Sequence, residues 1–200
     1  MQEEIKAIQE EYFPGKRTPE ENKALCEKYP FLKWYGNPLY MGYSEDHEPD
    51  YEYTWEDELF HSGPGWVKAF CPQIWDELKE ILAKANYVDK FRFVQIKEKW
   101  GQLRLYWQGA PNKIWDEVNA WTEKYLELSE NICIDCGVNK ATHLSLGWVS
   151  YVCKDCALKR DEEQLKKYNR GHEHFVRLEN LDEYYHNREA YWEKHKDEIV

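Results

Sequence analysis

Apolar residues recur every three or four positions in several stretches of the chain, which predicts amphipathic helices. The predicted helices cover residues 2–12, 18–29, 66–86, 111–129, 157–168 and 180–196. In the second of these, Thr18, Pro19 and Glu21 form the pattern of a capping box with proline in the first turn, and Pro30 ends the helix. Pro72 falls inside the third helix, either in an early turn or at a restart.

A different pattern, in which every second residue is apolar, occupies residues 91–98 and 102–107. Such alternation is typical of strands that bury one face. Trp100 and Gly101 separate the two runs and fit a tight turn. The sequence therefore predicts a β-hairpin between two helical segments.

The order of helix, hairpin and helix indicates an α+β fold, with helices around a β-hairpin or small antiparallel sheet. Residues 31–65 are rich in Gly, Pro, Asp and Tyr, which predicts a long irregular stretch with a short strand at about 52–55. We expect N-terminal helices at 1–30, an α+β body at 31–130, a cysteine module at 131–160 and a helical C-terminal extension at 161–200.

Charge is distributed unevenly along the chain. There are 27 Lys and Arg residues against 38 Asp and Glu, a net charge of −11, and the stretch 34–67 contains no Lys or Arg. Over most of its surface such a chain repels nucleic acid, so direct nucleic-acid binding is disfavoured unless a local basic face exists. A protein partner with a basic surface fits this charge better.

Aromatic residues make up 16% of the chain, with 10 Trp and 15 Tyr, and they alternate with the acidic residues of 34–67. Most aromatic rings in a chain of this size fill the core, but Tyr and Trp also dominate binding hot spots. Mere solubility is the competing explanation for the acidic residues. The predicted partner-binding residues of this acidic, aromatic loop are Glu45, Asp46, Glu48, Asp50, Tyr51, Glu52, Tyr53, Trp55, Glu56, Asp57 and Glu58.

Two Cys-x-x-Cys pairs carry the strongest chemical signal in the sequence. Cys133 and Cys136 are separated by sixteen residues from Cys153 and Cys156. Four thiolates at these spacings close a tetrahedral Zn²⁺ site, either in a treble-clef arrangement, with the second pair at a helix start, or in a plain zinc ribbon. Four protein ligands leave no position for water, so we expect a structural zinc ion without hydrolytic activity.

The hairpin offers a second, weaker candidate site. Lys97, Glu98, Lys99 and Arg104 place mixed charges near one end of it, and such a group could hold a phosphate or act as an acid and base pair. A solvated strand face with salt bridges is the simpler explanation.

The segment 96–106, IKEKWGQLRLY, precedes a predicted helix, the pair Cys133 and Cys136, and then Gly147 and Trp148 before the second pair. Over about residues 65–156 this arrangement resembles a recurrent class of uncharacterised phage and prophage proteins. The resemblance implies a bacteriophage origin and assigns no reaction.

By analogy, a small acidic phage protein without a recognisable catalytic motif is often an inhibitor of a host system. We therefore expect a non-enzymatic binding protein that inhibits a host bacterial defence or regulatory protein through the acidic, aromatic loop. The alternative is a nucleotide- or nucleic-acid-binding protein or enzyme that uses the hairpin charges and the zinc module. The chain shows no secretory signal pattern and no apolar run of membrane-spanning length, so the expected location is the host cytoplasm.

Overall fold

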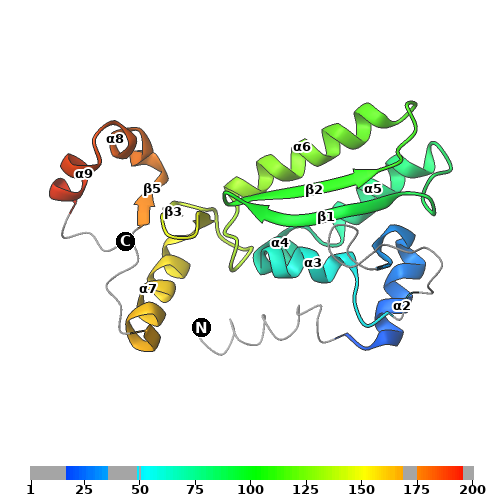
Figure 1. Ribbon diagram of the computed structural model, residues 1–200, viewed down its shortest axis with the longest axis horizontal. Helices are drawn as coiled ribbons and strands as arrows, with labels where there is room; N and C mark the ends of the chain where they lie inside the picture. The colour runs from blue at the N-terminus through cyan, green and yellow to red at the C-terminus, as the bar shows by residue number, and fades with distance from the viewer. Residues whose placement is uncertain (1–16, 36–48, 50, 169–174, 196–200) are drawn as a thin grey trace.

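The computed structural model describes residues 17–35, 49, 51–168 and 175–195. It has an α+β fold, as the sequence predicts, in which helices surround a two-stranded and a three-stranded antiparallel sheet (Figure 1). The helix predicted at 2–12 lies outside the described residues.

The first described helix, α2 (Pro19–Lys28), begins as predicted. The Thr18 hydroxyl accepts a hydrogen bond from the backbone N–H of Glu21 at 3.2 Å, and the Glu21 carboxylate accepts one from the Thr18 N–H at 2.7 Å. This capping box satisfies backbone donors that the first helical turn leaves unpaired. A short 3-10 helix, η2 (Pro30–Leu32), then carries the chain into the core.

The stretch predicted as irregular contains helix α3 (Trp55–Ser62) and the first residues of α4 (Pro64–Phe70), so the strand predicted at 52–55 is wrong. A second capping box explains the start of α3. The Thr54 hydroxyl accepts from the Asp57 N–H at 3.3 Å, while the Asp57 carboxylate accepts from the Thr54 N–H at 2.7 Å. Only Thr54 itself makes a β-bridge, with Lys33.

The helix predicted at 66–86 is divided in two. The first part ends with α4 at Phe70, and α5 (Gln73–Ala83) begins after Pro72. Proline has no amide hydrogen with which to continue a helical ladder, and its ring clashes with the preceding turn. Pro72 therefore marks a restart.

The predicted hairpin is confirmed by β1 (Arg92–Lys99) and β2 (Gln102–Gln108), which pair antiparallel with Lys97 opposite Arg104. Trp100 and Gly101 form the turn with φ values of +60° and +78°, as expected for a two-residue turn that follows the twist of the strands. Helix α6 (Trp115–Asn131) packs along β2, and α3 packs along β1.

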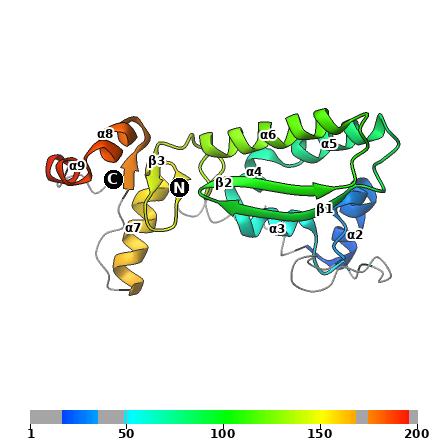
Figure 2. The same cartoon turned by 45° about the horizontal axis from the view of Figure 1, so that its top comes forward.

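Helices α4 and α5 lie behind the hairpin (Figure 2), and aromatic rings form the centre of the core. The ring centroid of Phe31 lies 6.3 Å from that of Trp75 and 6.2 Å from that of Phe91, and Phe93 packs edge-on against Phe91 at 5.3 Å. The Trp121 indole N–H donates to the backbone carbonyl of Ile74 at 3.1 Å. Many of the aromatic rings thus serve packing, and the indole N–H groups of Trp75 and Trp121 have acceptors.

The C-terminal part contains strands β3 (His143–Ser145) and β4 (Ser150–Val152), then helix α7 (Lys154–Tyr168). Strand β5 (Phe175–Arg177) pairs with β3, which gives the sheet order β4-β3-β5. The sequence predicted only helices after residue 160, so β5 is a correction.

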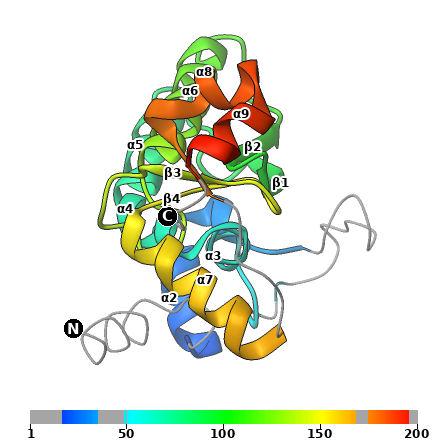
Figure 3. The same cartoon turned by 90° about the vertical axis from the view of Figure 1, so that its left-hand side faces the viewer.

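Past β5, a 3-10 turn, η3 (Leu178–Asn180), leads into α8 (Leu181–His186) and α9 (Arg188–Lys194). These two helices replace the single helix predicted at 180–196, because the chain leaves helical geometry at Asn187, which caps α9 through its side chain. Figure 3 looks along the molecule from this end, with α7, α8 and α9 in front of the body.

Among the helices of the described residues, none combines the length and the apolar character that crossing a membrane requires.

Candidate metal centre and adjoining pocket

The four predicted ligands come together at one point. The sulfur atoms of Cys133, Cys136, Cys153 and Cys156 all lie within 4.8 Å of one another, and the thiols are free rather than paired in disulfides. Two of the four, Cys133 and Cys153, are buried. The cluster can therefore hold a metal ion.

The spacing of the sulfurs fits a tetrahedral ion. Four Zn–S bonds of about 2.3 Å place the sulfurs about 3.8 Å apart, and the Sγ atoms of Cys136 and Cys153 are 3.9 Å apart. The donor set is all sulfur, which suits soft or borderline ions such as Zn²⁺ better than Mg²⁺ or Ca²⁺.

Backbone hydrogen bonds shape the loop around the first cysteine pair. The N–H of Cys133 donates to the carbonyl of Asn139 at 3.0 Å, and the N–H of Gly137 donates to the carbonyl of Cys133 at 2.9 Å. Gly137 has a φ of +62°, a left-handed conformation that glycine adopts without steric cost. The loop is therefore closed around the sulfurs by its own backbone.

The second pair lies at the start of α7, with Cys153 just before the helix and Cys156 in its first turn. The order is a cysteine loop, the β3–β4 hairpin and a helix that carries the last two ligands. This is the order of a treble clef, whereas a zinc ribbon would place the second pair on another hairpin. Between the two alternatives, the structure has the treble-clef arrangement.

Arg160 on α7 joins the parts of this module. Its guanidinium donates to both carboxylate oxygens of Asp135, at 2.7 and 2.6 Å, and to the Ser150 hydroxyl at 2.6 Å. A planar guanidinium is suited to such two-pronged contacts. One side chain thus links the cysteine loop, strand β4 and helix α7.

The cysteine loop is also joined to the body, through two glycines that touch backbone to backbone. The N–H of Gly65 in α4 donates to the Ile134 carbonyl at 2.7 Å. A Cβ atom on Gly137 would lie 2.0 Å from the Gly65 oxygen, and one on Gly65 would lie 2.3 Å from the Cys133 oxygen. No side chain fits at either position, so the module is not a detachable appendage.

Hydrogen bonding among the sulfurs distributes protons unequally in the metal-free cluster. The pKa of the Cys136 thiol is held far below its usual range, chiefly by a hydrogen bond from Cys133 and then by one from Cys156. The pKa of the Cys133 thiol is raised to about 12 by the same contact with Cys136. The cluster is thus arranged to carry negative charge at Cys136, which a cation would neutralise.

The acidic, aromatic loop is not one continuous surface. Glu45, Asp46, Glu48 and Asp50 lie outside the described residues, while Trp55, Glu56 and Asp57 are at most 3% exposed. Glu56 and Asp57 cannot contact a partner, which corrects that part of the prediction, whereas Trp55 contributes to the lining of a pocket. Tyr51 and Tyr53 are partly buried, and among the described acidic residues of this loop only Glu52 and Glu58 offer accessible carboxylates.

Glu56 is buried because it is an internal ion-pair partner. Its carboxylate pairs with Arg17 and accepts a hydrogen bond from the Trp75 indole N–H at 2.6 Å. Asp57 is occupied by the capping box of α3. Their charges therefore serve the fold rather than recognition.

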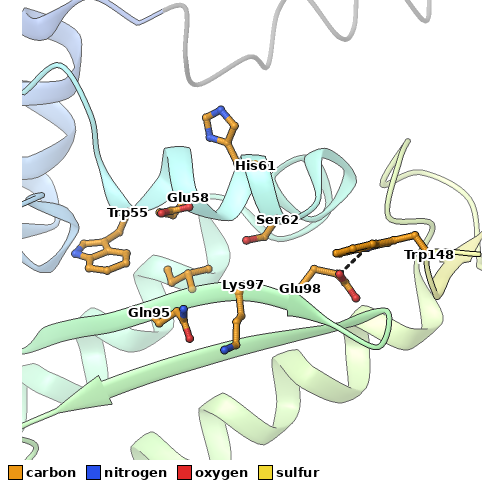
Figure 4. Close-up of a pocket in the computed structure, with 9 residues that line it drawn as sticks. Trp55, Glu58, His61, Ser62, Gln95, Lys97, Glu98 and Trp148 are labelled. Carbon is orange, nitrogen blue, oxygen red and sulfur yellow. Dashed lines mark hydrogen bonds between the residues drawn. The ribbon is translucent and has the colours of Figure 1, made fainter. Parts of the chain in front are cut away.

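A pocket of about 450 Å³ lies between α3, β1 and the turn that joins β3 to β4 (Figure 4). It is lined by Trp55, Glu58, His61, Ser62, Gln95, Ile96, Lys97, Glu98 and Trp148. Glu58 and Ser62 approach from α3, while His61 points away from β1 and Lys97 extends from the other side of that strand.

Two carboxylates and one exposed indole give this pocket its character. The Trp148 side chain is 75% exposed, and its indole N–H donates to the Glu98 carboxylate at 2.7 Å. The other Glu98 oxygen accepts from the Gly101 N–H at 2.6 Å. Burial raises the pKa of the Glu58 carboxyl, so a cation beside it would favour the charged form.

Sequence reasoning missed Trp148 as a pocket residue. The indole comes from the turn of the β3–β4 hairpin, 50 residues after Glu98. In the sequence, the only local indication of this role is a large aromatic residue next to Gly147 in a turn. That Trp148 contacts Glu98 follows only from the fold.

The hairpin charges are arranged differently from the salt-bridged strand face that the sequence favoured. Lys97, Lys99 and Arg104 form no ion pair with any described residue. Lys97 instead lies over the ring of Tyr106, with its Nζ 5.1 Å from the ring centroid. Glu98 forms no ion pair with these cations and accepts instead from Gly101 and Trp148.

Comparison with known proteins adds no family to this description: no protein-family model, curated protein or solved structure matches the chain.

Proposed function

We propose that this chain is a non-catalytic binding protein, held in shape by a structural zinc ion, whose partner is a host bacterial protein with a basic surface. Inhibition of that partner by direct contact is the corresponding activity. The observation that carries the proposal is the pocket beside α3, in which two carboxylates and an exposed tryptophan surround a space open to a cationic side chain.

Zinc is the ion that best suits the cysteine cluster. The sulfur separations match its tetrahedral bond lengths, and the treble-clef order is typical of structural zinc sites. With four thiolates bound, zinc would have no position for water, so it would supply folding energy rather than hydrolysis. The reducing cytoplasm of a host bacterium would keep the thiols available.

Elemental analysis of the purified chain is expected to give one zinc ion per molecule. Iron or a sub-stoichiometric metal content in fully folded protein would contradict the assignment, as would a disulfide between any two of the four cysteines. The thiols of Cys26 and Cys71 lie elsewhere in the fold and provide an internal comparison in thiol titrations.

The pocket favours a lysine or arginine side chain. A cation beside the Trp148 ring gains a cation–π contact, and Glu58 and Glu98 line the same pocket. The absence of Lys and Arg from 34–67 leaves no competing cation on α3, and the lysine among the lining residues, Lys97, has its Nζ atom over the ring of Tyr106. The exposed carboxylate of Glu52 adds to the negative electrostatic potential around the pocket.

This contact can be measured with a short fluorescein-labelled peptide of Lys and Arg residues and the zinc-loaded full chain. Fluorescence anisotropy should show saturable binding that weakens with salt, together with a change in tryptophan emission. Glu58→Gln is expected to lower the affinity roughly fivefold, the effect of losing one partly exposed charge pair. The matched control Glu163→Gln, on the exposed surface of α7, should leave it unchanged.

Equal affinities for the wild type and Glu58→Gln would exclude the pocket as the cation site. A pull-down from bacterial lysate then tests the partner itself: the wild type and Glu163→Gln should retain the same protein in stoichiometric amount, and Glu58→Gln should retain less. A retained protein with an acidic surface would contradict the proposal.

A further inference from the structure

The β1–β2 hairpin has one buried and one open face. On the buried face, Phe93, Ile96, Leu103 and Leu105 are at most 5% exposed. Since cross-strand partners share a face, the register places three pairs on the other side: Gln95 with Tyr106, Lys97 with Arg104, and Lys99 with Gln102. Among the described elements, helices lie behind the hairpin and along its edges, and none covers this open face (Figures 1 and 2).

The open face is basic in a chain with a net charge of −11. Lys97 and Arg104 lie opposite each other, and Lys99 follows two residues along β1, which is about 6.8 Å further on. None of the three pairs with a carboxylate of the described residues; the Arg104 guanidinium donates instead to the Gln102 side chain. Three cations in a row thus remain available to an anion.

Exposed rings accompany these cations. Tyr106 lies on the open face and is 42% exposed, and Trp100 at the turn is 66% exposed. The backbone of Trp100 is left-handed, at a φ of +60°, a conformation that is costly for a bulky residue and that Asn or Gly usually occupies in such turns. A strained, exposed aromatic residue is more typical of a contact site than of a position chosen for stability.

We propose that the open face of the hairpin binds single-stranded nucleic acid. Lys97, Lys99 and Arg104 contact successive phosphates, and bases stack on Tyr106 and Trp100. Cations beside exposed rings are the usual equipment of sites that hold single strands without reading their sequence. The side-chain amide of Gln95 lies on the same face and can reach base edges or sugars, while the Gln102 amide donates to Glu130 and accepts from Arg104.

An acidic protein segment would also satisfy the cations, but it gives the flat rings less to stack on. The overall negative charge does not prevent local binding, because at physiological ionic strength charges beyond about 8 Å are largely screened. The inference does not rest on the basic partner proposed above: the Nζ atom of Lys97 lies over the Tyr106 ring on the open face, although Lys97 is also one of the residues that line the pocket (Figure 4).

The test uses a fluorescein-labelled oligothymidine of about twelve nucleotides, within the usual site size for one such module, and the zinc-loaded full chain. Anisotropy titrations between about 50 and about 200 mM salt should give a log–log slope of roughly −2, as expected for three phosphate contacts on a single strand. Tryptophan fluorescence should be quenched as the strand binds.

Two sets of variants separate charge from stacking. Lys97→Ala with Arg104→Ala should weaken binding at least tenfold and reduce the slope by roughly 1.4. Tyr106→Ala should weaken binding about tenfold with the slope unchanged. The control, Lys23→Ala with Lys159→Ala, removes two exposed cations from α2 and α7 and should change neither quantity.

Trp100→Gly separates an effect on binding from an effect on stability, because the two are expected to change in opposite directions. It should raise the melting temperature, because the strained backbone is relieved, and yet weaken oligonucleotide binding several-fold. A variant that is more stable and binds equally well would remove Trp100 from the site.

Three outcomes would overturn the proposal. The first is that the oligonucleotide shows no saturable binding at low salt. The second is that the wild type, the Lys97 and Arg104 double variant and Tyr106→Ala all bind it equally well. The third is that a polyglutamate peptide binds the same face more tightly than the oligonucleotide does. Preference for duplex over single-stranded DNA would likewise exclude stacking as the mode of recognition.

Discussion

Replacing Cys153 with serine is expected to abolish stoichiometric metal binding and to unfold the cysteine module. Cys153 is buried next to Cys136, and serine cannot supply the fourth thiolate. In zinc modules the free energy of metal binding, about 10–16 kcal/mol, is largely folding free energy. This exceeds the total stability of many domains, about 5–15 kcal/mol.

The structural effect of Cys153→Ser should extend beyond the cysteine module. The cysteine loop contacts α4 through Gly65 and Gly137, and the hairpin turn at Gly101 lies against Tyr151. We therefore expect the amide resonances of residues 131–158 and of β5 to lose dispersion, and those of α4 and the hairpin turn to shift. Metal analysis and two-dimensional NMR of Cys153→Ser measure both effects.

Cys26→Ala is the matched control for the number of thiols. Cys26 is a buried residue of α2 and lies outside the sulfur cluster, so this variant should keep its metal and lose only packing energy. If Cys153→Ser retained one metal ion per chain and the melting temperature of the wild type, the cluster would not be the structural centre of this fold.

Glu56→Ala is expected to destabilise the protein by about 3–5 kcal/mol, the usual cost of removing one partner of a buried ion pair. The variant leaves the Arg17 guanidinium, whose side chain is only 26% exposed, without its carboxylate. It also leaves the Trp75 indole N–H without its acceptor. Urea denaturation measures the change as a shift of the midpoint at constant slope.

A double replacement distinguishes loss of charge pairing from loss of volume. Arg17→Met with Glu56→Leu removes both charges and keeps apolar volume, so it should recover much of the stability that Glu56→Ala loses. Glu163→Ala, at an exposed position, should change the midpoint little. A loss in Glu56→Ala no larger than in this control would show that the ion pair contributes little.

Features encoded over short distances were predictable from the sequence. The hairpin follows from alternation and a two-residue turn, and the four ligands follow from cysteine spacing alone. The capping box of α2 was predicted because Thr18 and Glu21 stand next to a proline. The same motif at Thr54 and Asp57 was missed, since its acidic residue belongs to a run of acids that was interpreted as surface charge.

Features that depend on distant partners were not predictable. Burial of Glu56 requires Arg17, which lies 39 residues earlier, and the pocket requires Trp148 beside Glu98. Strand β5 has three residues and gains its ladder only from β3, so no periodicity could reveal it. Tertiary contacts, rather than local preference, decide these elements.

The backbone contact between α4 and the cysteine loop makes one amide proton a reporter of metal arrival. The Gly65 N–H donates to the Ile134 carbonyl, inside the loop that carries the first two sulfurs. When that loop opens, the proton loses its acceptor and exchanges with solvent. In pulse-labelling hydrogen-exchange experiments, the time at which the Gly65 amide becomes protected would therefore give the time at which the cysteine loop closes, although that loop lies about seventy residues further along the chain.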